Sequence, residues 1–128
     1  MTIRVLVAED QAAVRAALVM ILRAEPGFEV VGQAADGEEA VRLALELRPD
    51  VVLMDVQMPQ LDGYGATRCI RSLQREDAAT VPIVAMSANA FAEDVRASLE
   101  AGMNAHLSKP IDMRKVVDTL VRLTRKGA

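Results

Sequence analysis

The chain has 128 residues, which fits a single domain spanning 1–128, and 52% of them are hydrophobic while only 2% are aromatic. Its 15 basic and 18 acidic side chains give a net charge of −3 without a basic stripe, which argues against direct nucleic-acid binding. No apolar run is long enough for a membrane span, and no signal peptide is expected at the start. Cys69 is the single cysteine, so an intrachain disulfide is excluded and a cytoplasmic location is expected.

The first half of the chain alternates short apolar segments with amphipathic ones. The predicted elements are, in order, a strand at Ile3–Ala8, a helix at about 11–24, a strand at Phe28–Ala34 and a helix that runs to about Leu47. Pro26 and Gly27 separate the first helix from the second strand. Asp36 is the expected cap of the second helix, and Glu39 is placed to reach back to it.

The segment Val51–Asp55 organises the rest of the chain. Four apolar residues, two of them valine, end in a carboxylate and are flanked by turn residues. A run this short predicts a strand that is buried on both faces. Asp55 then lies at the carboxyl end of that strand, on the edge of an open parallel sheet where ligands bind. Taken alone, an aspartate there is more often the cap of the next helix.

The second half continues the alternation. The predicted elements are a helix that starts at Asp62-Gly63, a strand at Val81–Ser87, a helix from Asn89 to Gly102, a brief strand at Ala105–Ser108 and a helix capped by Asp112. The residues expected on the apolar faces of the first two of these helices are Ala66, Cys69, Ile70 and Leu73, then Phe91, Val95 and Leu99. Strands and helices that alternate five times predict an α/β fold, with a parallel sheet covered on both faces and about five helices.

Charged and polar residues recur at the predicted strand ends. They are Glu9 and Asp10 after the first strand, Asp55 after the third, Ser87 after the fourth and Lys109 after the fifth. Carboxylates gathered at one edge repel one another and need a counter-charge. Oxygen ligands without histidine or cysteine suit a hard cation, most simply Mg²⁺. Lys109 can contact a phosphoryl oxygen, and Ser87 offers a hydroxyl donor.

This set of residues fits phosphoryl transfer to an aspartate. Asp55, expected to be ionised near neutral pH together with Glu9 and Asp10, can attack phosphorus and form an acyl phosphate without a general base. The cation and Lys109 would then neutralise charge on the transferring group. A Mg²⁺-dependent phosphohydrolase with an aspartate nucleophile is an alternative, but the second aspartate that it needs is replaced by Gln57. A non-phosphorylated interaction module would not need these residues together.

The sequence resembles the receiver domains of two-component response regulators over essentially its whole length. The matching residues are Glu9-Asp10, Met54-Asp55-Val56-Gln57-Met58-Pro59, Asp62-Gly63, Ser87-Ala88 and Lys109-Pro110. The resemblance implies a flavodoxin-like sheet in the strand order 2-1-3-4-5. It also implies a phosphoacceptor that catalyses only its own phosphotransfer and autodephosphorylation, with a phosphohistidine donor on a sensor histidine kinase or a histidine phosphotransfer domain.

The resemblance assigns a role to each matching position. Asp55 is the implied phosphoacceptor, and the implied Mg²⁺ ligands are Asp10, Asp55, the backbone carbonyl of Gln57 and, through water, Glu9. The other implied roles are phosphate contact for Lys109, a cis bond to Pro110, switching for Ser87 and His106, and tuning of dephosphorylation for Gln57 and Asn89. Phosphorylation-dependent dimerisation or partner binding is implied on the face of the fourth helix, fifth strand and fifth helix.

Two features depart from the usual receiver pattern. His106 stands where most receivers carry tyrosine or phenylalanine as the partner of the switch hydroxyl, so a simple aromatic flip is not implied. The stretch Met1–Asp50 is similar to regulators with a DNA-binding output domain, whereas Pro82–Asp112 is similar to receivers of hybrid sensor histidine kinases. A stand-alone receiver, an excised domain and an engineered chain all remain open.

Several residues have a plain structural interpretation. Cys69 is expected to be inert packing, and Met54 and Met86 to be core. Ser87 also suits a helix cap, and His106 a half-buried surface histidine. Tyr64 is expected to be partly exposed, with no assigned role.

Overall fold

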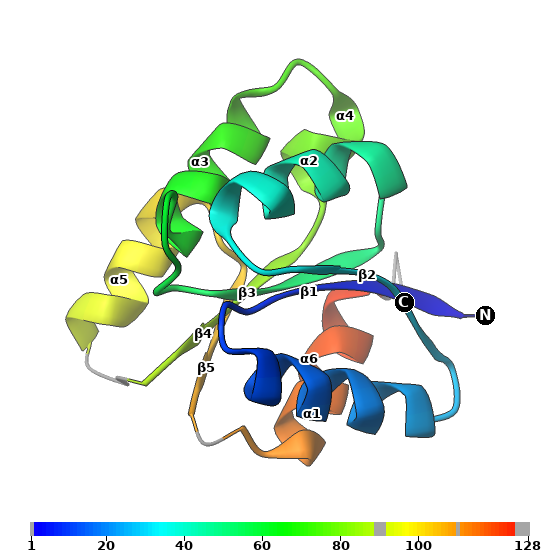
Figure 1. Cartoon of the computed structure of the whole chain (residues 1–128). Helices are drawn as coiled ribbons and strands as arrows, with labels where there is room; N and C mark the ends of the chain where they lie inside the picture. Colours follow the sequence, from blue (N-terminus) through cyan, green and yellow to red (C-terminus); the bar gives the residue numbers. More distant parts are fainter. Residues whose placement is uncertain (1, 89–91, 110, 125–128) are drawn as a thin grey trace.

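The computed structural model describes residues 2–88, 92–109 and 111–124, and it shows alternating strands and helices (Figure 1). The strands are β1 (Ile3–Ala8), β2 (Phe28–Ala34), β3 (Val51–Asp55), β4 (Ile83–Ser87) and β5 (Ala105–Ser108). The helices are α1 (Ala12–Ala24), α2 (Gly37–Leu47), α3 (Gly63–Ser72), α4 (Glu76–Thr80), α5 (Ala92–Ala101) and α6 (Met113–Thr124). All four strand pairings are parallel and give the order β2-β1-β3-β4-β5, which confirms the predicted flavodoxin-like sheet.

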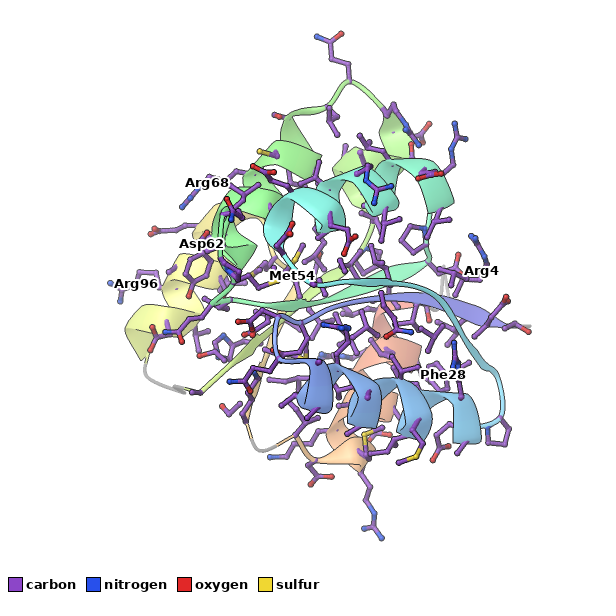
Figure 2. The ribbon with its side chains drawn as sticks, viewed as in Figure 1. Arg4, Phe28, Met54, Asp62, Arg68 and Arg96 are labelled. Carbon is purple, nitrogen blue, oxygen red and sulfur yellow. The ribbon has the colours of Figure 1, made fainter. Side chains whose placement is uncertain are left out.

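Helices cover both faces of the sheet. In Figure 1, α1 and α6 lie on one side, while α2, α3, α4 and α5 lie on the other. Two separate apolar clusters fill these layers, because successive strand residues point to opposite faces. Leu53 belongs to the cluster under α1 and α6, and its neighbour Met54, labelled in Figure 2, belongs to the other.

The central strand β3 is buried along its whole length. Val51 to Met54 have no exposed surface, as expected for a strand flanked by β1 and β4 and covered on both faces. A strand in this position gives its last residue, Asp55, a fixed place at the middle of the sheet edge. Met54 and Met86 are also completely buried, which confirms their assignment to the core.

Local capping fixes where several helices begin. The Asp36 carboxylate accepts a hydrogen bond from the amide of Glu39 at 2.8 Å, as predicted. Glu39 reaches back one residue further than expected and accepts from the amide of Ala35 at 2.8 Å. Asp62 caps α3 by accepting from Gly65 at 2.7 Å, so the segment after β3 turns directly into a helix.

Contacts distant in sequence anchor the end of α2. The Arg4 guanidinium, labelled in Figure 2, donates to the carbonyls of Arg48 and Leu47 at 2.7 and 2.9 Å. These carbonyls lack partners within the helix, so a cation there satisfies them. The contact ties β1 to the C-terminal end of α2.

The short helix α4 was not predicted. Arg75 holds it by pairing with Asp77 at 2.7 Å and donating to the carbonyl of Leu45 at 3.1 Å. The latter contact spans 30 residues of sequence, so no local pattern signals it. Strand β4 starts at Ile83 rather than Val81, since Pro82 cannot donate to the sheet.

Two predicted core positions are wrong. Cys69 is exposed, and the buried face of α3 carries Thr67 instead, whose hydroxyl donates to the carbonyl of Gly63 at 2.8 Å. Leu99 on α5 is 58% exposed, whereas its neighbour Ser98 is buried. In both helices a hydroxyl takes the inward position because it bonds to the backbone one turn earlier, at Gly63 and at Asp94 respectively.

Candidate functional site

The predicted site residues meet at one edge of the sheet. Glu9 follows β1, Asp55 ends β3, Ser87 ends β4 and Lys109 follows β5, so parallel pairing brings them to the same side. Glu9, Asp10 and Asp55 each place one carboxylate oxygen within 4.8 Å of the others. This acidic cluster is the one that the sequence predicted.

Glu9 is the most deeply placed carboxylate of the cluster, with no exposed surface. Its Oε1 accepts from Lys109 Nζ at 2.8 Å, and its Oε2 accepts from the amide of Gln11 at 3.1 Å. Burial alone would raise the pKa of Glu9, but the hydrogen bond from Lys109 and those from its other neighbours hold that pKa below its usual value. Glu9 is therefore ionised and paired in the absence of a metal ion.

Asp55 is only 4% exposed and is less well paired. Its Oδ2 lies 3.4 Å from Lys109 Nζ, and its Oδ1 accepts from the amide of Gln57 at 3.3 Å. Burial, followed by the adjacent Glu9 carboxylate, raises the pKa of Asp55 from 3.8 to about 7. This raised pKa disfavours ionisation of Asp55 in the metal-free protein, in contrast to the expectation from the sequence that all three carboxylates are ionised near neutral pH.

Lys109 is the cation that balances the cluster. Burial alone would lower the pKa of its ammonium group, but the hydrogen bond to Glu9 and the charges of Asp55 and Glu9 raise it above its usual value. Lys109 therefore stays charged at neutral pH. Because it lies closer to Glu9 than to Asp55, it holds Glu9 firmly and leaves Asp55 less fully neutralised.

Of the other predicted residues, Gln57 and Ser87 line an open cavity beside the cluster, together with Asp10. The cavity has a volume of about 610 Å³ and is lined by Asp10, Val56, Gln57, Met58, Pro59, Asp62, Tyr64, Ser87 and Asp94. Asp10 is exposed, Ser87 is buried and Tyr64 is half-buried. His106 is half-buried on β5, with its Nδ1 3.2 Å from Ser98 Oγ. Asn89, Phe91 and Pro110 lie outside the described residues.

Sequence reasoning missed Arg15, which helps to shape the site. Its guanidinium donates to the carbonyl of Glu9 at 2.7 Å and thereby secures the turn between β1 and α1. An arginine on the first turns of a helix is common on protein surfaces, so its type alone gives no signal. Arg15 lies six residues after Glu9 in the sequence, and only the folded turn brings its guanidinium to the Glu9 carbonyl.

Gly63 holds the loop that carries Asp55 and Gln57. Its amide donates to the carbonyl of Val56 at 2.9 Å, which closes the loop against the start of α3. A Cβ atom at Gly63 would overlap the backbone carbonyl oxygen of Asp55. The backbone that follows the acidic cluster can therefore take this path only with glycine at position 63.

Gly63→Ala is expected to destabilise the protein by about 2–3 kcal/mol, because the new methyl group meets backbone that cannot move aside. The urea midpoint of unfolding measures the effect. Gly65→Ala is the matched control in the same helix, since its methyl would meet chiefly the flexible end of Leu61. Equal losses in the two variants would contradict the close approach at Gly63.

The donor set suits a hard divalent cation. Asp10 and Gln57 line the open cavity, and the Asp55 carboxylate lies within 4.8 Å of that of Asp10, so the site offers oxygen ligands alone. Glu9 is enclosed and already bonded to Lys109 and Gln11, which suits a less direct role. The residues present therefore fit Mg²⁺, with Asp10 as the exposed ligand and Asp55 as the buried one.

Comparison with known proteins identifies relatives across most of the chain. The family model described as the response regulator receiver domain matches residues 5–121. A protein-glutamate methylesterase/protein-glutamine glutaminase of Myxococcus xanthus is 43% identical over 127 residues, covering 92% of this chain and 35% of that protein. The transcriptional regulatory protein PdtaR of Mycobacterium tuberculosis is 41% identical over 117 residues, covering 91% of this chain and 54% of that protein. The chain thus spans about a third to a half of the length of these relatives.

Solved structures agree with these matches. The receiver domain of a sensor histidine kinase from Pseudomonas aeruginosa, described with a magnesium ion coordinated in the active site cleft, is 39% identical, with a TM-score of 0.85 and coverage of 97% of this chain and 98% of that chain. The response regulator domain of Thermotoga maritima CheB is 31% identical, with a TM-score of 0.86 and coverage of 97% of both chains. Among the described helices, none is long and apolar enough to cross a membrane. The chain belongs to the response regulator receiver domain family of two-component signalling.

Proposed function

We propose that this chain accepts a phosphoryl group on Asp55 from a phosphohistidine donor, in a Mg²⁺-dependent reaction, and changes conformation to relay a two-component signal. One observation carries the proposal. A nearly buried aspartate ends the central strand within reach of two further carboxylates and a lysine, beside a cavity that is open to a phosphodonor. A carboxylate kept only for stability would not be expected with so strongly raised a pKa.

The chemistry follows from the placement of the side chains. A carboxylate oxygen of Asp55 forms a bond to phosphorus while the bond from phosphorus to the imidazole nitrogen of the donor breaks. Lys109 contacts one phosphoryl oxygen, and the Ser87 hydroxyl donates to another. Asp10, Asp55 and the carbonyl of Gln57 would hold Mg²⁺, with Glu9 acting less directly, and the ion would supply positive charge for the carboxylates and the transferring group.

The same proposal covers the surroundings of the reaction. The donor is a sensor histidine kinase or a histidine phosphotransfer domain, and the setting is the cytoplasm. The chain acts as one domain over 1–128, does not bind nucleic acid or membrane itself, and catalyses only its own phosphotransfer and dephosphorylation. Gln57 and Asn89 tune the lifetime of the acyl phosphate. Output passes through the face of α5, β5 and α6, by dimerisation or by binding a partner.

Incubation with acetyl phosphate and Mg²⁺ is expected to add one phosphoryl group to the intact protein, as measured by mass spectrometry. Asp55→Asn should abolish this mass increase, and EDTA should prevent it in the parent, because the first change removes the attacking carboxylate and the second removes the cation. Asp62→Asn is the matched control in the same loop, since asparagine also caps helices well. Labelling that persists in Asp55→Asn would contradict the assignment.

A further inference from the structure

A buried hydroxyl links helix α5 to the predicted switch residue on β5. Ser98 is 1% exposed and lies on the face of α5 that packs against the sheet. Its Oγ is 3.0 Å from the carbonyl oxygen of Asp94, one turn earlier in α5, and 3.2 Å from Nδ1 of His106. Both distances are within hydrogen-bonding range.

The Ser98 hydroxyl has one proton for these two contacts. The carbonyl of Asp94 can only accept, whereas Nδ1 of His106 donates or accepts according to the ring tautomer. Either protonated Nδ1 donates to Ser98 Oγ while the hydroxyl donates to Asp94, or the hydroxyl donates to unprotonated Nδ1. In both arrangements a hydrogen bond at Nδ1 ties the ring of His106 to α5.

His106 and Ser87 lie on the same face of the sheet. On β4, Ile83 and Ala85 belong to the apolar cluster under α2 and α3, whereas Leu107 on β5 belongs to the opposite cluster. Because strand side chains alternate, Ser87 lies on the face of Ala85, and His106 faces away from the side of Leu107. Ala85 pairs with His106 in the sheet register, and its small side chain leaves room for the ring under α5.

We propose that Ser98 is a positioning residue, which latches His106 to α5 in the unphosphorylated protein. The inference rests on the proposed function. Ser87 directly precedes the segment that leads into α5, so movement of its hydroxyl toward a phosphoryl oxygen acts on the helix that carries Ser98. The latch stabilises the resting arrangement of α5 against β5, and phosphorylation must overcome it. Removing the latch therefore favours the phosphorylated arrangement.

The hydrogen bond at Nδ1 of His106 provides the first test. Long-range nitrogen–proton NMR spectra at about pH 8, where an ordinary histidine is neutral, report the tautomer of the ring and the environment of each ring nitrogen. The latch requires a hydrogen bond at Nδ1 in the parent, so Ser98→Ala should move the Nδ1 resonance or change the ring tautomer. An Nδ1 resonance and a tautomer that both stay the same in Ser98→Ala would overturn the proposal.

Affinity for beryllofluoride, which stands in for the phosphoryl group, provides the second test. A net hydrogen bond of about 1 kcal/mol corresponds to roughly fivefold, so Ser98→Ala should bind beryllofluoride with Mg²⁺ about fivefold more tightly while melting at a lower temperature. A merely structural role would lower the melting temperature without tightening binding. His106→Phe, which also lacks the hydrogen bond, should reproduce the tighter binding, and the double variant should add nothing further.

Thr124→Val is the matched control, because Thr124 makes the same bond to the carbonyl four residues earlier, at 2.7 Å, but sits on α6. It should leave beryllofluoride affinity unchanged. Unchanged or weaker binding in Ser98→Ala and His106→Phe overturns the latch alone. Failure of the parent to bind beryllofluoride at all would overturn the proposed function and the latch with it.

Discussion

Lys109→Met is expected to destabilise the metal-free protein by about 3 kcal/mol near pH 8, measured as a fall in the urea midpoint in the presence of EDTA. The reason is the position of Glu9, which has no exposed surface and accepts from Lys109 Nζ at 2.8 Å. Methionine keeps much of the side-chain volume but leaves Glu9 buried without its cation. A buried charge that loses its partner costs more than the pair contributed.

The loss in Lys109→Met should shrink as the pH falls. Without the ammonium group, the pKa values of Glu9 and Asp55 rise in the folded state, so the folded protein takes up protons that the unfolded chain does not hold. Groups with a raised folded pKa stabilise the fold at low pH and lose this contribution as the pH rises through the folded value. The variant should therefore approach the parent at about pH 5 and fall furthest behind it at about pH 8.

Lys115→Met is the matched control, because it removes the same charge from an exposed position on α6. Its effect on the urea midpoint is expected to be within about 0.5 kcal/mol. A similarly small, pH-independent change in Lys109→Met would show that water or a rearranged side chain satisfies Glu9 in the variant. The buried pairing described above would then not control the stability of the cluster.

The strand ends were predictable from the sequence because alternating strands and helices leave little freedom in topology. Once Val51–Asp55 is recognised as a buried central strand, parallel pairing places Glu9, Ser87 and Lys109 at the same edge as Asp55. These positions depend on the backbone alone, and local patterns carry that information. Glu9, Asp10 and Asp55 do gather at this edge, each with one carboxylate oxygen within 4.8 Å of the others.

What the sequence did not reveal depends on packing between distant segments. Cys69 and Leu99 have the apolar character of core residues, yet Thr67 and Ser98 take the buried places because their hydroxyls bond to their own helices. The protonation of Asp55 likewise depends on how deeply Glu9 is enclosed beside it, which no residue type discloses. The positions of the ionisable groups could thus be predicted from the sequence, but the protonation of Asp55 could not.

Asp55→Asn is expected to stabilise the metal-free protein, and the gain should grow with pH. The pKa of Asp55 is raised from 3.8 to about 7, first by burial and then by Glu9. Between about pH 4 and 7 the folded state keeps a proton that the unfolded chain releases, so the parent loses stability as the pH rises through this window. Above it the penalty to the folded state is complete, and it amounts to something on the order of 4 kcal/mol. Asparagine has no proton to lose and retains the shape of the neutral carboxyl group.

Urea midpoints in EDTA at about pH 4.5 and 8 measure the difference in stability between Asp55→Asn and the parent. This difference should be small at the lower pH and large at the higher pH. Asp10→Asn removes a charge from the same cluster, but Asp10 is exposed, so water screens its repulsion and its gain should be much smaller. At pH 8 Mg²⁺ should make the parent more stable than Asp55→Asn, since the ion binds only the folded site and needs Asp55 ionised. If Asp55→Asn unfolds earlier than the parent at pH 8 in EDTA, the hydrogen bonds from Lys109 and Gln57 outweigh the repulsion from Glu9, and the cluster is not strained.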